Sequence, residues 1–378
     1  FSRGIVINPN ALEKPMKDEI SAVMLHYLLK ELQPLTKGKI DKIFQLPNKD
    51  FYFQMHVTGK GKHILRVVLG KYIYLTDYKP ASPKSPLGYC MFLRKYLKGA
   101  KLKEIHQKDF ERIVEFVFEV KNEKKEIVTR KLIIELFSKG NMVLLDEHDV
   151  IMSPLETQTW KDRTIKKGEV YKYPKKPYNP LSGTKQEFAQ IVKHSEKTSL
   201  VKSLAINIGL GGLFAEELCL RAKMVKTIRP RDVKDNDIEH LFSELQNLLN
   251  QKADQLLVLE EGTTKIKDIV PYPLVSYEHD ETKPLETLHQ GMDEVYTSKS
   301  LEKAEEQQQS GKKKKMSKVE NIIEAQQKQV DNLRKAVDEN QLKGEIIYEN
   351  YPVVKEIIDV IKQARKKHSW GEIKEKLK

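Results

Sequence analysis

The spacing of apolar residues changes from helical to strand-like early in the chain. Across 20–35 they recur at intervals of three and four, and Pro34 and Gly38 close the pattern, which predicts an amphipathic helix. Short runs rich in β-branched and aromatic residues follow, and a short helix is predicted at 89–97. The runs predict a meander of antiparallel strands over 39–46, 50–57, 63–68, 72–76, 113–120, 127–137 and 142–145.

The second half of the chain has mainly helical patterns. Short helices are expected over 186–212, 215–222 and 237–249, with late strands at 255–260 and 268–277. From Met316 a heptad can be written that predicts a coiled-coil helix ending at Gly344, with Pro352 opening another helix and Ser369 and Glu372 capping a last one. Its a positions are Met316, Ile323, Val330 and Val337, and its d positions are Val319, Gln326, Leu333 and Asn340.

Basic residues clearly outnumber acidic ones. The 378 residues include 67 Lys and Arg against 54 Asp and Glu, a net charge of +13 and a pI of about 9.3. Such a surplus favours a polyanionic partner, most often nucleic acid and next an anionic membrane. The plain alternative is a surface rich in both signs with no such partner. With 39% hydrophobic residues, the chain can bury real cores, and its length fits two to four modules.

Several functional classes lack their sequence signals. Cys90 and Cys219 are far apart, so neither a disulfide framework nor a cysteine-based metal site is expected. No apolar run reaches the roughly 20 residues of a membrane span and no signal peptide is visible, so a cytoplasmic location is expected. Residues 1–15 show no period before Met16 and resemble an expression remnant. Because phosphate-loop, nucleophile-elbow, metalloprotease and dinucleotide motifs are missing, catalytic residues and cofactors are not expected.

A glycine-rich stretch is the first candidate site. Residues 208–215 have the shape of a helix–hairpin–helix, in which Gly209, Gly211 and Gly212 let the backbone approach a phosphate. The helix that follows offers free N–H groups, so such a site reads the nucleic-acid backbone rather than the bases. From the motif alone, a helical corner that merely packs on the core is an equally good interpretation.

A basic segment at 160–178 is the second candidate. It holds seven Lys or Arg against two acidic residues, interleaved with Trp160, Tyr171, Tyr173 and Tyr178. This mixture suits single-stranded or looped RNA, whose exposed bases can stack. The alternative is a solvated loop whose tyrosines are anchored in the domain. The candidate phosphate contacts of the segment are Lys166, Lys167, Lys175 and Lys176.

Glu111 and Arg112 form a third candidate, at the start of a predicted strand after a helical turn. Taken alone, this pair is better explained as an ordinary salt bridge at a strand edge.

Six stretches in a fixed order, from Met16 onward, give the chain a family resemblance. They are 89–97, 110–116, 134–144, 168–171, 210–219 and 343–351. Together they resemble the NFACT family of ribosome-associated quality-control elongation factors. The implied fold is an α+β multidomain protein with a glycosylase-like (MutM-like) N-terminal lobe of antiparallel strands. The expected parts are that lobe at 16–180, a helix–hairpin–helix domain at 181–236, a return segment packing on the lobe at 237–285, a coiled-coil arm at 286–344 and the start of a small helical middle domain at 345–378.

The resemblance also implies an activity. Such proteins bind a large ribosomal subunit that still holds peptidyl-tRNA. They recruit tRNA, alanyl-tRNA in bacteria, for mRNA-independent C-terminal tailing of the stalled nascent chain. Ribosomal RNA forms the peptide bond, so the protein itself is not expected to be an enzyme. The C-terminal RNA-binding module of the family is missing, so the chain looks truncated, and a coil without its return arm can self-associate.

The family has an Asp-Arg pair that is tied to tRNA recruitment. Here it matches Glu111-Arg112, which changes the favoured interpretation of that pair from a salt bridge to tRNA recognition. Arg94 and Lys95, in the predicted helix at 89–97, are further candidate tRNA contacts.

Other protein classes fit less well. A DNA glycosylase of this fold needs an N-terminal proline after Met removal, whereas Lys17 follows Met16. An adhesin would need an export signal. A DNA- or RNA-binding protein of glycosylase-like fold without tailing activity stays open as an alternative.

Overall fold

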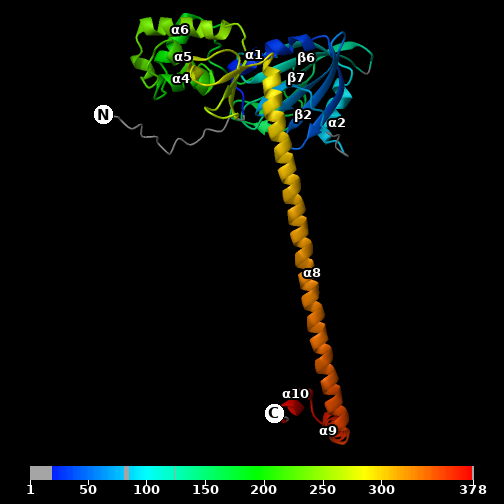
Figure 1. The fold of residues 1–378 in the computed structure, drawn as a ribbon. Helices are drawn as coiled ribbons and strands as arrows, with labels where there is room; N and C mark the ends of the chain where they lie inside the picture. The colour runs from blue at the N-terminus through cyan, green and yellow to red at the C-terminus, as the bar shows by residue number, and fades with distance from the viewer. Residues whose placement is uncertain (1–18, 81–84, 123, 377–378) are drawn as a thin grey trace, which may run out of the picture. The chain divides into compact units, whose positions relative to one another are not determined.

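The described residues form a nine-stranded antiparallel sheet, the largest element of the fold (Figure 1). Its order, β4-β3-β2-β1-β5-β6-β7-β8-β9, consists of two meanders that meet where Lys39 of β1 pairs with Lys101 of β5. This arrangement confirms the expected meander. The strands are β1 Lys39–Leu46, β2 Asp50–Val57, β3 Gly61–Val68, β4 Tyr72–Thr76, β5 Lys101–Gln107, β6 Ile113–Lys121, β7 Ile127–Glu135, β8 Asn141–Leu145 and β9 Ile151–Pro154.

The computed structural model describes residues 19–80, 85–122 and 124–376, without the side chains of 299–319, 321 and 376. The expected start at Met16 and the remnant at 1–15 lie outside these residues. The described chain divides into two compact units between Ser300 and Leu301. No helix of the described residues has both the length and the apolar character that crossing a membrane would require. The finer domain boundaries expected from the sequence stay predictions.

Strand β5 was not predicted, although it joins the two meanders. Its seven residues include only two buried apolar side chains, Leu102 and Ile105, which are three positions apart. A register shift between Leu102 and Glu104 brings both onto the buried face. The bulge therefore hides the period of two by which a half-buried strand is normally recognised.

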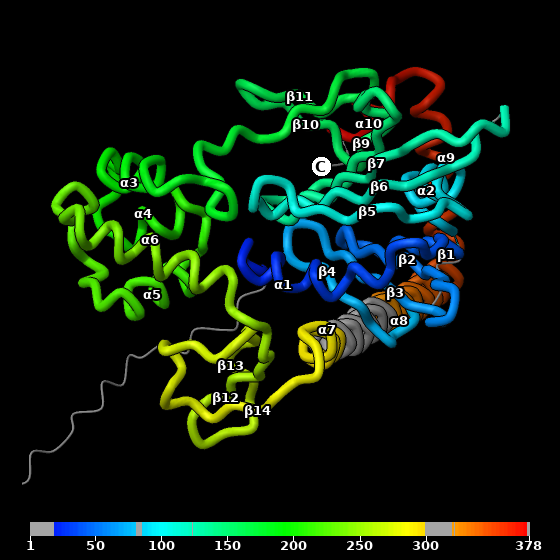
Figure 2. The backbone as a smooth tube through the Cα atoms, turned by 90° about the horizontal axis from the view of Figure 1, so that it is seen from above, coloured from blue at the N-terminus to red at the C-terminus, as the bar shows by residue number. Residues whose placement is uncertain are grey.

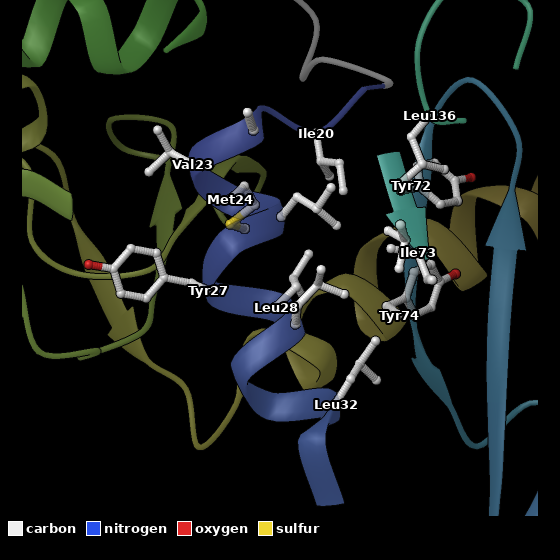
Figure 3. Packing of buried hydrophobic residues seen from close by; sticks show 14 of the residues in the cluster. Ile20, Val23, Met24, Tyr27, Leu28, Leu32, Tyr72, Ile73, Tyr74 and Leu136 are labelled. Atoms are coloured by element: carbon white, nitrogen blue, oxygen red, sulfur yellow. The ribbon is translucent and has the colours of Figure 1, made fainter. Parts of the chain in front are cut away.

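Helix α1 (Ala22–Leu32) packs between the large sheet and the rest of the first unit (Figures 2 and 3). One side of it places Leu28 and Leu32 toward Ile73 and Tyr74 of β4, as Figure 3 shows. From the other side, the Tyr27 hydroxyl donates to the carbonyl of Gln251 at 2.8 Å. Because α1 is buried on both sides, its N-terminal end is held in a fixed place.

A helical lobe and a small sheet complete the first unit (Figure 2). The helices are α2 Gly88–Leu97, which packs on β1, then α3 Lys185–Lys193, α4 Leu200–Ile206, α5 Gly211–Arg221 and α6 Asp235–Asn250. The described residues add a two-stranded hairpin of β10 Gln158–Thr159 and β11 Thr164–Ile165, and a three-stranded sheet of β12 Leu256–Leu259, β13 Ile266–Val270 and β14 Thr282–Pro284. Short turns of 3-10 helix are η1 Gln33–Leu35, η2 Pro230–Asp232 and η3 Val275–Tyr277.

The strand expected at 268–277 is shorter than predicted. It ends at Val270, because Pro271 and Pro273 interrupt the pattern and the chain turns into η3. The buried carboxylate of Glu217 on α5 then holds this turn, since it accepts hydrogen bonds from the backbone of Val275 and Ser276 at 3.0 and 2.9 Å.

Helix α7 (Leu288–Met292) and a π-helical turn, η4 (Asp293–Thr297), lead into the long helix α8 (Ser298–Glu349). The prediction that Gly344 ends this helix was wrong, since α8 continues to Glu349. A single glycine costs a helix only about 1 kcal/mol, which the flanking helix-forming residues offset. Helices α9 (Tyr351–Arg365), with Pro352 in its first turn as expected, and α10 (Trp370–Lys376) follow. The backbone N–H of Ser369 donates to Glu372 at 3.0 Å, in agreement with the expected cap.

The apolar heptad positions of α8 are exposed within the second unit. They include Ile323, Val330, Leu333 and Val337. The side chains of the other two predicted apolar positions, Met316 and Val319, are not among those that the structure describes. Coiled-coil pairing of this helix stays a prediction.

Candidate nucleic-acid interface

A cleft of about 400 Å³ brings together three segments that are far apart in sequence. The turn between β5 and β6 contributes Glu111 and Arg112. The start of α1 and the residues just before it contribute Glu19, Ile20, Ser21, Ala22 and Met24. The turn before α5 contributes Gly209, and the first residues of α5 contribute Gly211 and Gly212. The Glu-Arg pair and the glycine motif, which were separate candidates in the sequence, therefore line one site.

The β5–β6 turn has an unusual backbone that fixes the Glu-Arg pair. The N–H of Glu111 donates to the carbonyl of Lys108 at 2.7 Å, and the residues between them, Asp109 and Phe110, have φ of 47° and 57°. Two consecutive positive φ values are typical of a type I′ hairpin turn, but a bulky aromatic residue there is rare. The Phe110 side chain is 1% exposed, so its burial offsets this strain and anchors the turn at the cleft.

Glu111 and Arg112 pair with different residues. The Arg112 guanidinium donates through Nη1 to Glu19 Oε2 at 2.6 Å, and this is its only acceptor among the described residues. The Arg112 side chain is 27% exposed, and the backbone carbonyl of this residue accepts from Leu136 N–H at 2.8 Å. A guanidinium has five donors in a planar fork, so Arg112 retains donors for a phosphate.

Lys176 supports the cleft from behind, through its contact with the lining residue Glu111. Its ammonium lies 3.2 Å from Glu111 Oε1 and donates to the carbonyl of Phe110 at 3.0 Å, and its side chain is 7% exposed. Burial lowers the pKa of Lys176, although Glu111 acts in the opposite direction. A Cβ atom at Gly209, where φ is +86°, would lie 2.8 Å from Lys176 Nζ. The positive φ favours glycine there, and any larger residue would also have to move the end of the Lys176 side chain.

Two helix N-termini face the cleft. Helix α5 begins at Gly211 without a side-chain cap from the described residues, so its first N–H groups lack intrahelical acceptors. In α1, the Ser21 hydroxyl accepts from the Met24 N–H at 3.0 Å. A Cβ at Gly211, where φ is +76°, would lie 3.5 Å from Ser21 Cβ, so the two helix starts almost touch. Converging helix N-termini attract anions through free N–H groups and aligned dipoles.

Carboxylates also line the cleft, and they limit what can bind. They belong to Glu19, Glu111 and Asp268. Glu111 is paired with Lys176, and Asp268 accepts from the Tyr277 hydroxyl at 2.8 Å. Glu19 is half exposed and lies against Arg112, the basic side chain among the described residues that line the cleft. An incoming phosphate that uses the Nη1 donor of Arg112 must therefore displace Glu19, and one that uses the remaining donors still meets the negative charge of Glu19.

The structure places Arg94 and Lys95 on α2, and neither is among the described residues that line the cleft. The Arg94 Nε donates to the carbonyl of Ile43 at 2.8 Å, and its guanidinium lies over the Phe44 ring. Lys95 is exposed. A tRNA contact by either residue stays a prediction, and Arg94 would have to leave the sheet to make it.

The basic segment is anchored more firmly than its composition suggested. Tyr171 and Tyr178 are buried, and the Tyr173 hydroxyl donates to Glu115 at 2.6 Å. For these tyrosines the structure favours the alternative in which they are anchored in the domain, because their side chains are used inside the lobe. Trp160 stays 45% exposed. Of the four lysines predicted to contact phosphate, Lys166, Lys167 and Lys175 are exposed, whereas the Lys176 side chain is only 7% exposed. Phosphate binding by the three exposed lysines stays a prediction.

Glu19 and Ser21 are cleft residues that sequence reasoning missed. Ser21 had a signal, because a serine just before an apolar helical pattern is a common N-cap. Glu19 had none, since its partner Arg112 is 93 residues away.

The sequence matches a family model described as NFACT N-terminal and middle domains over residues 21–377. It is 34% identical to an archaeal Rqc2 homologue, aRqcH, of Methanocaldococcus jannaschii, over 95% of this chain and 54% of that protein. It is 25% identical to the human ribosome quality control complex subunit NEMF, over 95% of this chain and 35% of that protein. The chain thus spans about half or less of the length of these relatives.

Among solved structures, the fold resembles a fibrinogen-binding protein of Staphylococcus aureus. The TM-score is 0.60 at 21% identity, over 73% of this chain and 98% of that one. This likeness confirms the mixed α+β fold with an antiparallel sheet.

Proposed function

The chain belongs to the NFACT family, and from that premise we propose that it is part of a ribosome-associated quality-control factor of the cytoplasm. The names of its relatives support this role, since they include a subunit of the ribosome quality control complex. The net charge of +13 supports a partner rich in phosphate, such as the large ribosomal subunit.

Within that role, the cleft binds tRNA through its backbone. Arg112 contacts a phosphate, and the free N–H groups at the start of α5 contact the same or the next phosphate. Glu111 acts indirectly by holding Lys176 and the turn in place. The observation that carries this assignment is the convergence of Arg112, Gly211 and Gly212 on one cleft, although they come from separate segments.

The tRNA bound in this way would serve mRNA-independent tailing of a nascent chain on a large subunit that carries peptidyl-tRNA. The family resemblance supports this step. The proposal gives the chain a recruiting role, and the ribosome forms the peptide bond.

The test is tRNA affinity after Arg112→Ala. Losing a phosphate contact of this kind should cost on the order of 1–3 kcal/mol, or roughly 5- to 150-fold in affinity, while the melting temperature stays nearly unchanged. Arg231→Ala is the matched control, because that arginine is 68% exposed in η2 and is outside the described cleft lining. Arg112→Lys should recover only part of the affinity, since the charge returns without the planar fork.

Arg112→Ala also leaves Glu19 without a partner, and its charge alone would repel phosphate. The double variant Glu19→Gln, Arg112→Ala removes this complication and should still bind weakly. Equal tRNA affinity of this double variant and the parent, both fully folded, would refute the proposal. Competition by duplex DNA as effective as that by tRNA would instead favour the alternative of general nucleic-acid binding without tailing.

A further inference from the structure

We propose that Trp160 is a stacking platform for one unpaired nucleobase of an RNA partner, with phosphate contacts supplied by neighbouring exposed lysines. The inference rests on the proposed RNA-binding function but concerns a different surface, because Trp160 is not among the described residues of the cleft. Trp160 is the aromatic residue of the basic segment that is exposed to solvent, at 45%.

Trp160 lies at the tip of the β10–β11 hairpin. The strands pair through Thr159 and Thr164, and the Trp160 N–H donates to the carbonyl of Arg163 at 2.8 Å. The turn is therefore short and closed by backbone pairing. The side chain is 45% exposed, although the chain buries most of its large aromatic side chains in this lobe.

Arg163 holds one face of the indole. Its guanidinium carbon lies 4.5 Å from the ring centroid, a cation–π contact. Arg163 is itself fixed by Glu135 at 2.9 Å, with side chains 9% and 2% exposed, and Tyr171 donates to the same carboxylate at 2.7 Å. The exposed area of Trp160 therefore belongs to the opposite face and the ring edge. A ring already held in place loses little conformational freedom when it stacks.

The surroundings favour a nucleobase over other flat or apolar ligands. Lys161, Lys166 and Lys167 are exposed within seven residues of Trp160. The same stretch holds two acidic residues, Asp162 and Glu156, and Glu156 pairs with Lys49 at 2.8 Å. A single indole among lysines is too small to dock a helix, but it matches one base with its flanking phosphates. The competing explanation is that Trp160 only covers the Arg163–Glu135 pair, which would stabilise the hairpin without binding RNA.

Fluorescence tests the proposal on the folded protein, because the chain has only two tryptophans, Trp160 and Trp370. The Trp370→Phe variant makes Trp160 the single reporter. A ten-nucleotide single-stranded RNA without self-complementarity should quench it, since a stacked base contacts the indole. An abasic oligonucleotide of the same length carries the same phosphates without bases and should quench it little. Equal quenching by both oligonucleotides, or none by the RNA, would overturn the proposal.

Affinity gives a second readout. Trp160→Ala should weaken binding of the single-stranded RNA on the order of tenfold and leave the salt dependence unchanged, because stacking releases no counterions. Trp160→Phe should restore most of the affinity. If Trp160→Ala binds as the parent does, the residue has only a covering role. If Arg112→Ala lowers tRNA affinity as expected but the RNA does not quench Trp160 fluorescence, only the stacking inference is refuted. If the RNA quenches Trp160 fluorescence but Arg112→Ala leaves tRNA affinity unchanged, only the cleft proposal is refuted.

Discussion

Replacing Glu19 by glutamine should strengthen tRNA binding, because it frees Arg112 for a phosphate. The Arg112–Glu19 contact is 2.6 Å long, and the two side chains are 27% and 51% exposed. A pair this open to solvent contributes about 0.2–1 kcal/mol, and the short distance and lower exposure of Arg112 place it in the upper half of that range. A phosphate no longer has to replace that interaction, so affinity should rise roughly two- to fivefold.

Fluorescence anisotropy with labelled tRNA measures the change, and thermal melting shows whether the fold is intact. Glu239→Gln is the matched control, since that carboxylate is 61% exposed and pairs with Lys185 in the helical lobe. Both variants remove one negative charge, so a general electrostatic gain appears in both. If Glu19→Gln binds no better than Glu239→Gln, the idea that Glu19 occupies the phosphate position is wrong.

Three further predictions concern the wider surface and the scaffold. Alanine at Lys166, Lys167 and Lys175 should reduce the slope of log Kd against log salt by up to about 3, as measured by tRNA titrations; an unchanged slope would remove these lysines from the interface. Gly212 is at an exposed helical position, so Gly212→Ala should raise the free energy of unfolding by about 0.5–1 kcal/mol. The same change should weaken tRNA binding, because the methyl group crowds the free N–H groups of α5; if the variant binds tRNA as tightly as the parent, this backbone is purely structural. Burial by itself would raise the pKa of Glu217, but hydrogen bonds from Arg221 and Ser276 bring it below its ordinary value. The Glu217 carboxylate therefore stabilises the fold at pH values above the pKa it has in the unfolded chain, and this stabilisation is lost as the pH falls through its pKa in the folded protein. Glu217→Gln should lower the free energy of unfolding by about 3 kcal/mol at pH 7 and by less in acid. Urea unfolding curves of parent and variant whose midpoints differ equally at pH 7 and pH 3 would contradict this.

The sequence predicted the elements with a clean period and missed those without one. Helix α1 and strands β1 to β4 could be recognised because one face of each is apolar at a regular interval. Strand β5 could not, because its bulge breaks the alternation between Leu102 and Ile105. Gly344 was mistaken for a helix end because glycine has a local cost that a long helix can tolerate.

The candidate site shows a similar division. The glycine motif and the resemblance around Arg112 identified two walls of the cleft, since both depend on local sequence. Their meeting could not be predicted, because it depends on tertiary packing of α1 against α5. Charge counting also could not tell that Lys176 is buried while Lys175 is exposed, or that Glu19 pairs with Arg112.

Amide hydrogen exchange with and without tRNA tests the cleft most directly. The N–H groups of Gly211, Gly212 and Leu213 begin α5 without intrahelical acceptors, so they should exchange fast in the free protein. If phosphate binds there, tRNA should slow exchange in a peptide spanning 209–214 and in one spanning 108–112, and leave α6 at 235–250 unchanged. Unaltered exchange at 209–214 under saturating tRNA, with protection elsewhere, would show that tRNA binds another surface.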